Sequence, residues 1–545
     1  MNTPIEYFSD EDKELIRAIR SLYDQRNYDE AIEKITMKLE SLSSCHTKED
    51  SFLKMELSGS LIDIGEEGKI KEAAVQGLRI IEADKEDMRK FITESSIEYN
   101  LGNAKSTLFK IERNQPGFRY VPKNIGYLLE SKNHYWKSFK ADAAKDKATD
   151  PRLLTNLANA LSSCGRVVES LQYYDLVLRN DPGFPNANAS RAKELLWLNH
   201  LTGDYTQNLI YQAKVGYEMA SRAEGNPLWL REFWGKEAKN LGEVLISVGF
   251  DESNLDKEIG ETRKEYESLS GYRKFCINNH LALSEHSLYC NCIGSRRDDL
   301  LICVPFRAFD SHFIPTMEKI LNRLKSEYSL SRLMYFYSTA DIENEFTAYD
   351  SEVVFTELFD SEYIGIKSEM LRSSFRLCFG ILDKIASAVC FLFDLADQGE
   401  PIYFESFWKP RRQNASAKQR KRWDKINSLD NISLLALYAQ ANDLNRKTGE
   451  WGVFKSWRNS LEHNQLCLLN DQETKIDIFG VNKTKPYLTV EKKEYFESKT
   501  LQMLQFTRSA IFNFVFLVRN EAMKSTQSKE GAIKHTFTFK NDKEA

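Results

Sequence analysis

Apolar residues recur at intervals of three and four positions along most of the chain, which favours α-helices over strands. The longest such segments lie in the C-terminal part: residues 313–337, 366–397, 432–469 (interrupted near Gly449) and 491–525. The apolar stripe of the second segment comprises Phe375, Leu382, Ile385, Val389 and Leu392. Long helices that each present one apolar face pack economically as an antiparallel bundle, which is the architecture we predict for this part.

The N-terminal part has shorter helical segments arranged in pairs. In residues 156–182, an apolar helix is followed by a turn at Gly165, a second helix with Tyr174 on its apolar face, and an Asp-Pro stop. Pro182 lies 31 positions after Pro151, which also follows an aspartate. This unit resembles a tetratricopeptide repeat, whose period is about 34 residues. Weaker copies occupy residues 23–40, 66–82 and 201–220.

These patterns predict an all-α protein, in which a TPR-like α-solenoid precedes a C-terminal helical bundle. We expect a repeat domain at residues 1–222, a helical connector at 223–270, the bundle with an accessory N-terminal segment at 271–525, and a polar tail at 526–545. Stacked repeats bury faces that no single helix pair could bury, and they often bind a protein or peptide ligand. A plain dimerisation scaffold is the alternative for this domain.

Composition narrows the class of protein. The 545 residues are 42% apolar and carry a formal net charge of −5, so any nucleic-acid contact must rest on a local patch. The N-terminus lacks the basic head and apolar run of a signal peptide, and we expect no membrane role. The nine cysteines are scattered, which favours a reducing, cytoplasmic location.

Cysteines and histidines gather between residues 276 and 303. Cys276 with His280, and His286 with Cys290, are pairs four positions apart that could each aim two ligands at one zinc ion. However, the closely spaced Cys290 and Cys292 do not form a usual zinc knuckle, and buried cysteines often act as small apolar residues. We therefore predict no metal or other cofactor. Zinc binding by Cys276, His280, His286 and Cys290 is the alternative.

The stretch SWRNSLEHNQL, residues 456–466, combines four polar groups on one helix face: Arg458, Asn459, Glu462 and His463. At about 100° per residue these groups lie opposite the face that carries Trp457. Arg458 and Glu462 are four positions apart, as are Asn459 and His463, so each pair could hold its members in place. A solvated surface helix is the simplest alternative explanation.

The motif resembles the signature of the HEPN superfamily, an arginine and a histidine separated by four to six residues with a polar residue after the arginine. Arg458, Asn459 and His463 match it with a gap of four. The segments YRKFCINNHLAL, FRLCFGILDKIA and LQMLQFTRSAIFNFVFL occur in the order of a bacterial HEPN branch that often follows TPR-like repeats, so the resemblance covers roughly residues 271–525.

The resemblance implies a metal-independent endoribonuclease. His463 would take a proton from a ribose 2′-hydroxyl and Arg458 would hold the scissile phosphate, giving a 2′,3′-cyclic phosphate. Asn459 would orient the phosphate or the imidazole, and Glu462 would order Arg458. The resemblance also implies a homodimer with facing motifs, and a role as a toxin or anti-phage abortive-infection effector whose repeats sense a trigger.

The basic stretch WKPRRQNASAKQRKRWDK, residues 408–425, fits an RNA substrate. It holds eight lysines or arginines, one aspartate, and both Trp408 and Trp423. Phosphate attraction and aromatic stacking together favour single-stranded RNA, although a basic loop that docks an acidic partner is an alternative. The expected RNA-binding residues are Arg411, Arg412, Lys418, Arg420, Lys421 and Arg422.

The rival for the whole chain is a non-catalytic scaffold whose HEPN-like bundle dimerises or binds nucleotide. Other enzyme classes have little support, because the sequence has no Walker loop, no dinucleotide fingerprint, no His-Glu-x-x-His and no nucleophile elbow.

Overall fold

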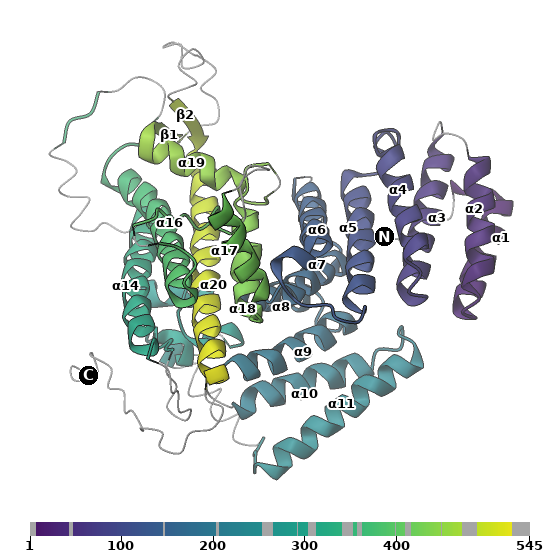
Figure 1. The fold of residues 1–545 in the computed structure, drawn as a ribbon, viewed down its shortest axis with the longest axis horizontal. Coiled ribbons are helices and arrows are strands. Elements are labelled where there is room, and N and C mark those ends of the chain that lie inside the picture. Colours follow the sequence, from purple (N-terminus) through teal and green to yellow (C-terminus); the bar gives the residue numbers. More distant parts are fainter. Residues whose placement is uncertain are drawn as a thin grey trace. The chain divides into compact units, whose positions relative to one another are not determined.

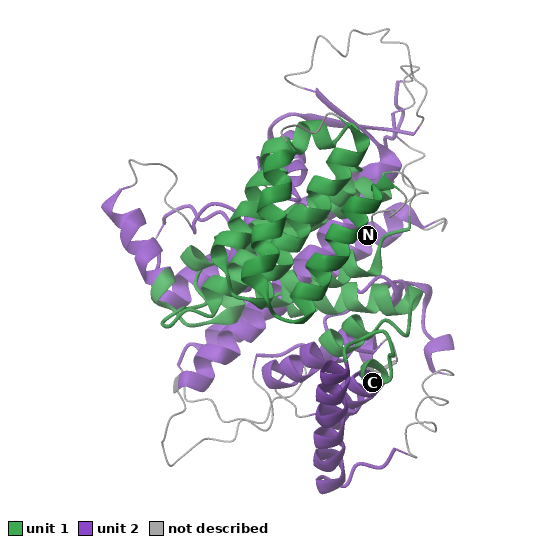
Figure 2. Ribbon diagram, turned by 90° about the vertical axis from the view of Figure 1, so that its right-hand side faces the viewer, with its two compact units in different colours: residues 1–191, 219–227, 427–435 green, residues 192–218, 228–426, 436–545 purple. Residues whose placement is uncertain are grey.

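A computed structural model describes residues 7–42, 47–144, 148–202, 206–252, 265–290, 293–302, 312–340, 353–356, 362–397, 399–408, 416–447, 449–470 and 488–525. These residues are mainly helical, which confirms the all-α fold class (Figure 1). They form two compact units (Figure 2). Unit 1 comprises residues 1–191, 219–227 and 427–435, and unit 2 comprises residues 192–218, 228–426 and 436–545.

Unit 1 is a row of helices in which each packs against the next in the sequence (Figure 1). The helices are α1 (Asp10–Asp24), α2 (Tyr28–Ser41), α3 (Lys48–Glu67), α4 (Lys71–Met88), α5 (Glu94–Arg113), α6 (Gly126–Ala143), α7 (Pro151–Ser163) and α8 (Val167–Asn180). A short 3-10 turn, η2 (Pro122–Asn124), precedes α6. Neighbour-to-neighbour packing is the arrangement that stacked helical repeats produce, and it is consistent with the TPR-like prediction.

The helix pair α7–α8 forms as its sequence predicts. The Asp150 side chain accepts a hydrogen bond from the Arg152 backbone N–H and so caps α7. Gly165 forms the turn with a φ of +79°, a left-handed conformation that favours glycine. A Cβ at this position would lie 2.6 Å from the backbone oxygen of Ile432, so the turn also needs glycine for close approach.

Ile432 belongs to a short C-terminal segment, residues 427–435, that is part of unit 1. Arg119 donates a hydrogen bond to the backbone oxygen of Ser428 (2.8 Å), and the Lys123 backbone N–H donates one to the Asn427 side chain (2.8 Å). Residues more than 300 positions apart in the sequence are thus joined within one unit.

Unit 2 contains the predicted bundle, in which α14, α16 and α20 pack against one another and lie side by side in Figure 1. Helices α9, α10, α17 and α18 are divided between the two units. The helices that lie wholly or partly in unit 2 are α9 (Pro185–Leu201), α10 (Gln207–Ser221), α11 (Leu228–Ser247), α13 (Gly271–Asn278), α14 (Ile314–Thr339), α16 (Ile366–Phe393), α17 (Ala417–Ser428), α18 (Ile432–Asp443), α19 (Gly452–His463) and α20 (Lys493–Ser525), with 3-10 turns η3 (Glu285–Leu288) and η4 (Ile293–Arg296).

Helix α20 is the one helix among the described residues whose length and apolar character would suit a membrane span. Its most apolar window is 83% buried inside the protein. Burial of this kind is what a central bundle helix shows, and the apolar surface of α20 is used for packing against α14 and α16.

Three buried arginines attach the accessory segment before the bundle. Arg332 on α14 pairs with Asp298 and donates to the backbone oxygen of Leu281 (2.8 Å). On α20, Arg508 donates to the backbone oxygen of Ala282 (2.8 Å), and Arg519 donates to that of Ile302 (3.2 Å). Because planar guanidinium groups satisfy several acceptors at once, polar contacts at Leu281, Ala282, Asp298 and Ile302 hold the accessory segment to the bundle.

The four residues of the possible zinc site have other surroundings. Cys276 is buried, and burial raises the pKa of its thiol, so it remains protonated. The Nδ1 atom of His286 shares a hydrogen bond with the Tyr289 hydroxyl (2.9 Å). Within the described part of the chain, no three histidine, cysteine or acidic residues gather where they could hold a metal, so Cys276, His280, His286 and Cys290 form no such group. Cys292 and Cys303 lie outside the described residues.

The bundle also contains two strands that the helical pattern did not predict. β1 (Gln465–Leu469) and β2 (Leu488–Lys492) pair in parallel, with Gln465 opposite Leu488. The predicted helix over residues 432–469 is therefore wrong after His463, and the one predicted from residue 491 begins at Lys493. Leu466 and Leu468 are buried while their neighbours are more exposed, and this alternation is typical of a strand.

Candidate active site on helix α19

Aromatic packing fixes the orientation of α19. Phe454 and Trp457 are buried and pack against Phe375 of α16, and Trp457 also packs against Phe496 of α20. The Trp457 indole N–H donates a hydrogen bond to the Glu491 carboxylate on β2 (2.9 Å). With the apolar face held in this way, the opposite face of α19 directs its polar residues away from the core.

Arg458 is held in place by α16 and by the segment that follows it. Its Nη2 atom donates to Oδ2 of Asp383 at 2.9 Å, and only 21% of each side chain is exposed. The guanidinium lies 5.2 Å from the ring centre of Phe379 and 5.9 Å from that of Tyr403. Two aromatic neighbours and one carboxylate restrict the arginine to a narrow set of positions, while its remaining N–H groups stay available for an anion.

Asp383 connects Arg458 to the backbone. Its Oδ1 atom accepts a hydrogen bond from the Phe404 N–H at 2.9 Å. Burial raises the pKa of the Asp383 carboxyl above its ordinary value, although the Phe404 N–H and Arg458 both favour the charged form. The carboxylate therefore fixes the arginine and the 403–405 segment together.

Glu462 has a different partner from the one the helical spacing predicted. It pairs with Arg376 of α16, at 3.0 Å and 3.3 Å from the two guanidinium nitrogens, whereas Asp383 holds Arg458. The prediction that Glu462 orders Arg458 is therefore wrong. Contacts between α16 and α19 determine the pairing, and spacing along a single helix could not reveal them.

Asn459 is half-buried and His463 is exposed at the last residue of α19. Among the described residues, neither side chain has a hydrogen-bond or ion-pair partner. His463 lies five positions after Arg458, which separates their directions by about 140° on a regular helix. The imidazole is thus open to a ligand or to a second subunit, and the expected mutual pairing of Asn459 and His463 is not made.

The basic stretch is partly neutralised by nearby carboxylates. Lys418 pairs with Asp397 and Glu400, and Arg422 is buried, pairs with Glu400 and donates to the backbone oxygen of Leu395. Partial burial opposes ionisation of Glu400, but hydrogen bonds from Arg422 and Lys418 lower its pKa to about 2. The carboxylate therefore keeps its charge near neutral pH and counters these two cations.

Other members of the stretch differ in exposure. Arg420 and Lys421 are exposed, whereas Trp408 is buried and the half-buried Trp423 packs against Tyr438, so Trp408 presents no open face for stacking. Arg411 and Arg412 lie outside the described residues. Of the described residues predicted to bind RNA, Arg420 and Lys421 are thus the best placed to meet a phosphate.

The sequence did not reveal Asp383 and Arg376 as parts of the site. Both lie on α16, seven positions and therefore about two turns apart, on the same face as each other. The signal that could have found them is their position within the long apolar stretch of α16, because charges there need partners on a neighbouring element.

The helical bundle that carries Arg458 and His463 lies within a region that matches a known family. Residues 309–521 match the family model described as LA2681-like HEPN, so the C-terminal region of the chain belongs to this superfamily as an LA2681-like HEPN domain. No curated protein and no solved structure that was compared with the chain matches it. The superfamily assignment suggests ribonuclease or nucleotide-binding function.

Proposed function

We propose that the protein is a metal-independent endoribonuclease of the HEPN type. The observation that carries the proposal is the placement of Arg458 and His463 near the end of α19 in an LA2681-like HEPN domain, with Arg458 fixed by Asp383 and His463 exposed. A fixed guanidinium suits a phosphodiester whose charge increases during reaction, and an accessible imidazole suits proton transfer near neutral pH.

In this mechanism, His463 accepts the proton of a ribose 2′-hydroxyl and the 2′-oxygen attacks the adjacent phosphorus. The bond from phosphorus to the 5′-oxygen breaks, which leaves a 2′,3′-cyclic phosphate and a 5′-hydroxyl end. Arg458 binds the phosphate through N–H groups that Asp383 does not occupy, and Asn459 orients the phosphate or the imidazole. The pair formed by Glu462 and Arg376 places a further cation close to the motif.

The leaving 5′-oxygen needs a proton as well, and one histidine does not readily serve as base and acid in the same turnover. A two-fold homodimer with facing α19 helices would supply a second His463 as the acid. The exposure of His463 at the end of its helix supports such an arrangement.

The biological role that we propose is that of a cytoplasmic toxin or anti-phage abortive-infection effector. The TPR-like helices would bind a protein or peptide trigger, or restrain the nuclease until one arrives. Their stacked arrangement supports this part, because a row of paired helices offers an extended surface for a ligand.

The test compares wild type, Arg458→Ala and His463→Ala in host growth and in cleavage of total RNA with EDTA present. His312→Ala is the matched control, because His312 is an exposed histidine of the same family region. We expect wild type and the control to cleave RNA, and both motif variants to lose at least about a hundredfold of the rate while their circular dichroism is unchanged. Equal behaviour of all four proteins would instead indicate the non-catalytic scaffold.

A further inference from the structure

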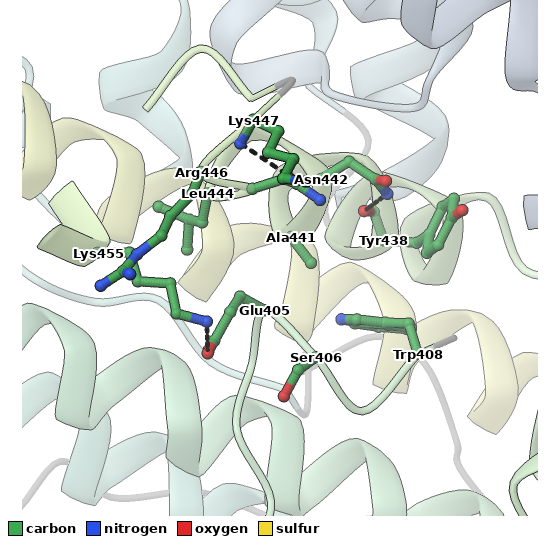
Figure 3. Close-up of a pocket in the computed structure, with 11 residues that line it drawn as sticks. Glu405, Ser406, Trp408, Tyr438, Ala441, Asn442, Leu444, Arg446, Lys447 and Lys455 are labelled. Carbon is green, nitrogen blue, oxygen red and sulfur yellow. Dashed lines mark hydrogen bonds and ion pairs between the residues drawn. The ribbon is translucent and has the colours of Figure 1, made fainter. Parts of the chain in front are cut away.

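A cavity of about 540 Å³ lies in unit 2, between the segment after α16, the end of α18 and the start of α19 (Figure 3). Its volume falls in the range of about 300–1,000 Å³ typical of small-molecule sites. The residues that matter here are Glu405, Tyr438, Asn442, Arg446, Lys447 and Lys455. Neither the HEPN motif nor the predicted basic patch includes any of them.

The cavity shares two walls with the Arg458 site. Lys455 lies on α19 three positions before Arg458, so both side chains leave the same side of the helix. Lys455 pairs with Glu405 at 2.6 Å, and Tyr403, two positions before Glu405, lies against the Arg458 guanidinium. An RNA strand with one phosphate bound to Arg458 would therefore place a neighbouring nucleotide at this cavity.

The loop between α18 and α19 gives the cavity its positive charge. Arg446 and Lys447 are exposed, and neither side chain has an ion-pair partner among the described residues. The loop is tightly closed, since the Trp451 N–H donates to the backbone oxygen of Asp443 at 2.7 Å. A Cβ on Gly449 would lie only 2.2 Å from that same oxygen, so this position requires glycine. The two cations thus lie between Asp443 and Trp451, which this backbone hydrogen bond joins.

Polar groups complete the lining, and the Tyr438 ring beside them is buried against Trp408 and Trp423. Figure 3 shows Lys455 joined to Glu405 on one side of the cavity, with Tyr438 on the other. The pair presents a hydrogen-bond acceptor beside a donor, which is the combination that reads the edge of a nucleobase. Asn442 donates to the backbone oxygen of Tyr438 at 2.7 Å, which holds this side chain at the wall of the cavity.

We infer that this cavity binds the nucleotide next to the scissile phosphate of a single-stranded RNA. Arg446 and Lys447 contact the phosphate of that nucleotide, and its base lies against the Glu405–Lys455 pair, which selects among bases. The inference rests on the proposed ribonuclease function and adds to it a subsite that determines where the RNA is cut.

The first test measures RNA binding separately from cleavage. In the His463→Ala background, a labelled single-stranded oligoribonucleotide is titrated with protein carrying Arg446→Glu or Lys447→Glu, and fluorescence anisotropy gives the Kd. The matched control is Lys319→Glu, which makes the same charge change at an exposed lysine of α14 outside the cavity. We expect the Kd to rise roughly tenfold in the two cavity variants and less than about twofold in the control.

The second test maps cleavage ends by sequencing in an otherwise wild-type background. Glu405→Gln should change the base preferred at one position beside the cut, while the cut itself continues to depend on His463. An unchanged Kd in the cavity variants, together with an unchanged base preference, would overturn the subsite but leave the nuclease intact. If neither wild type nor His463→Ala cleaves RNA, the nuclease proposal fails, and with it the assignment of the cavity to a scissile phosphate.

Discussion

The two units of the protein are built from the same kind of element but depend on contacts of different range. In unit 1, α3 to α8 each pack against the next helix, and the Asp150 cap and the Gly165 turn lie within the pair that they organise. In unit 2, Arg508 hydrogen-bonds to Ala282 across 226 positions, and Arg458 pairs with Asp383 across 75. Apart from its segment 427–435, which distant contacts join to it, the row of helices in unit 1 is therefore built from local contacts. The bundle of unit 2 depends on polar groups that are far apart in the sequence.

The largest effect that we expect is on the long-range contacts of unit 2. Asp298→Asn removes the charge that faces the buried Arg332 and leaves the guanidinium without its carboxylate. Removal of one member of a buried ion pair costs roughly 3–5 kcal/mol. Chemical denaturation should show this loss in the free energy of unfolding, with Asp424→Asn, at an exposed position, as the control. A loss below about 1 kcal/mol would contradict the dependence of unit 2 on long-range contacts, because this pair would then not stabilise it.

The lowered pKa of the Asp298 carboxyl determines how the stability of the protein changes in acid. Asp298 is mostly buried, which opposes its ionisation, but Arg332 lowers its pKa to about 2. Its stabilisation is complete above an ordinary carboxyl pKa of about 4 and is lost as the pH falls towards 2, a change of roughly 2 kcal/mol. The difference in unfolding free energy between wild type and Asp298→Asn should therefore shrink over this interval. A difference that stays constant would contradict the ion pair as its source.

In unit 1, a matched pair of glycines separates backbone strain from close packing. Gly165 and Gly117 both have a φ of +79°, but a Cβ would approach Ile432 at Gly165 and has nothing within 4 Å at Gly117. Gly117→Ala should cost about 1 kcal/mol from strain, and Gly165→Ala about 1–2 kcal/mol more. Thermal unfolding of the two variants measures the difference. Equal losses would mean that residues 427–435 do not pack closely on the α7–α8 turn.

The smallest effect concerns the positioning of Arg458. Asp383→Asn keeps an acceptor for the guanidinium but removes the charge, and we expect kcat for RNA cleavage to fall about tenfold with little change in stability. Because the pKa of Asp383 is raised, activity that depends on the ionised carboxylate should fall sooner on acidification than an ordinary aspartate would predict. In Asp383→Asn this acid limb should disappear from the pH profile. An unaltered profile would show that Asp383 does not position the arginine through its charge.

The contrast between local and distant contacts also explains what could be predicted from the sequence. The helix pair at residues 151–180, the all-α class and the HEPN resemblance were predicted, because helical periodicity, capping residues and a short motif are local signals. Strands β1 and β2 were missed because each needs the other for its hydrogen bonds. Asp383, the actual partner of Arg458, was missed for the same reason.

The basic stretch shows a second limit. Its charge density predicted a surface for RNA, but the sequence could not show that Glu400 would pair with both Lys418 and Arg422, or that Trp408 would be buried. Conversely, Arg446 and Lys447 did not stand out in the sequence. A closed loop and the neighbouring walls give them a setting that suits an anion.

The membership of residues 427–435 in unit 1 has a practical consequence for dissecting the molecule. A truncation that deletes the helical repeats would remove Arg119, Lys123 and Gly165, which contact Ser428, Asn427 and Ile432. A simple deletion therefore does not test whether the HEPN region functions alone. Activity would be lost if residues 427–435 became misplaced, and equally if the repeats were needed as a sensor. A fragment beginning near residue 192 would need this nonapeptide redesigned with polar side chains before its behaviour could be interpreted.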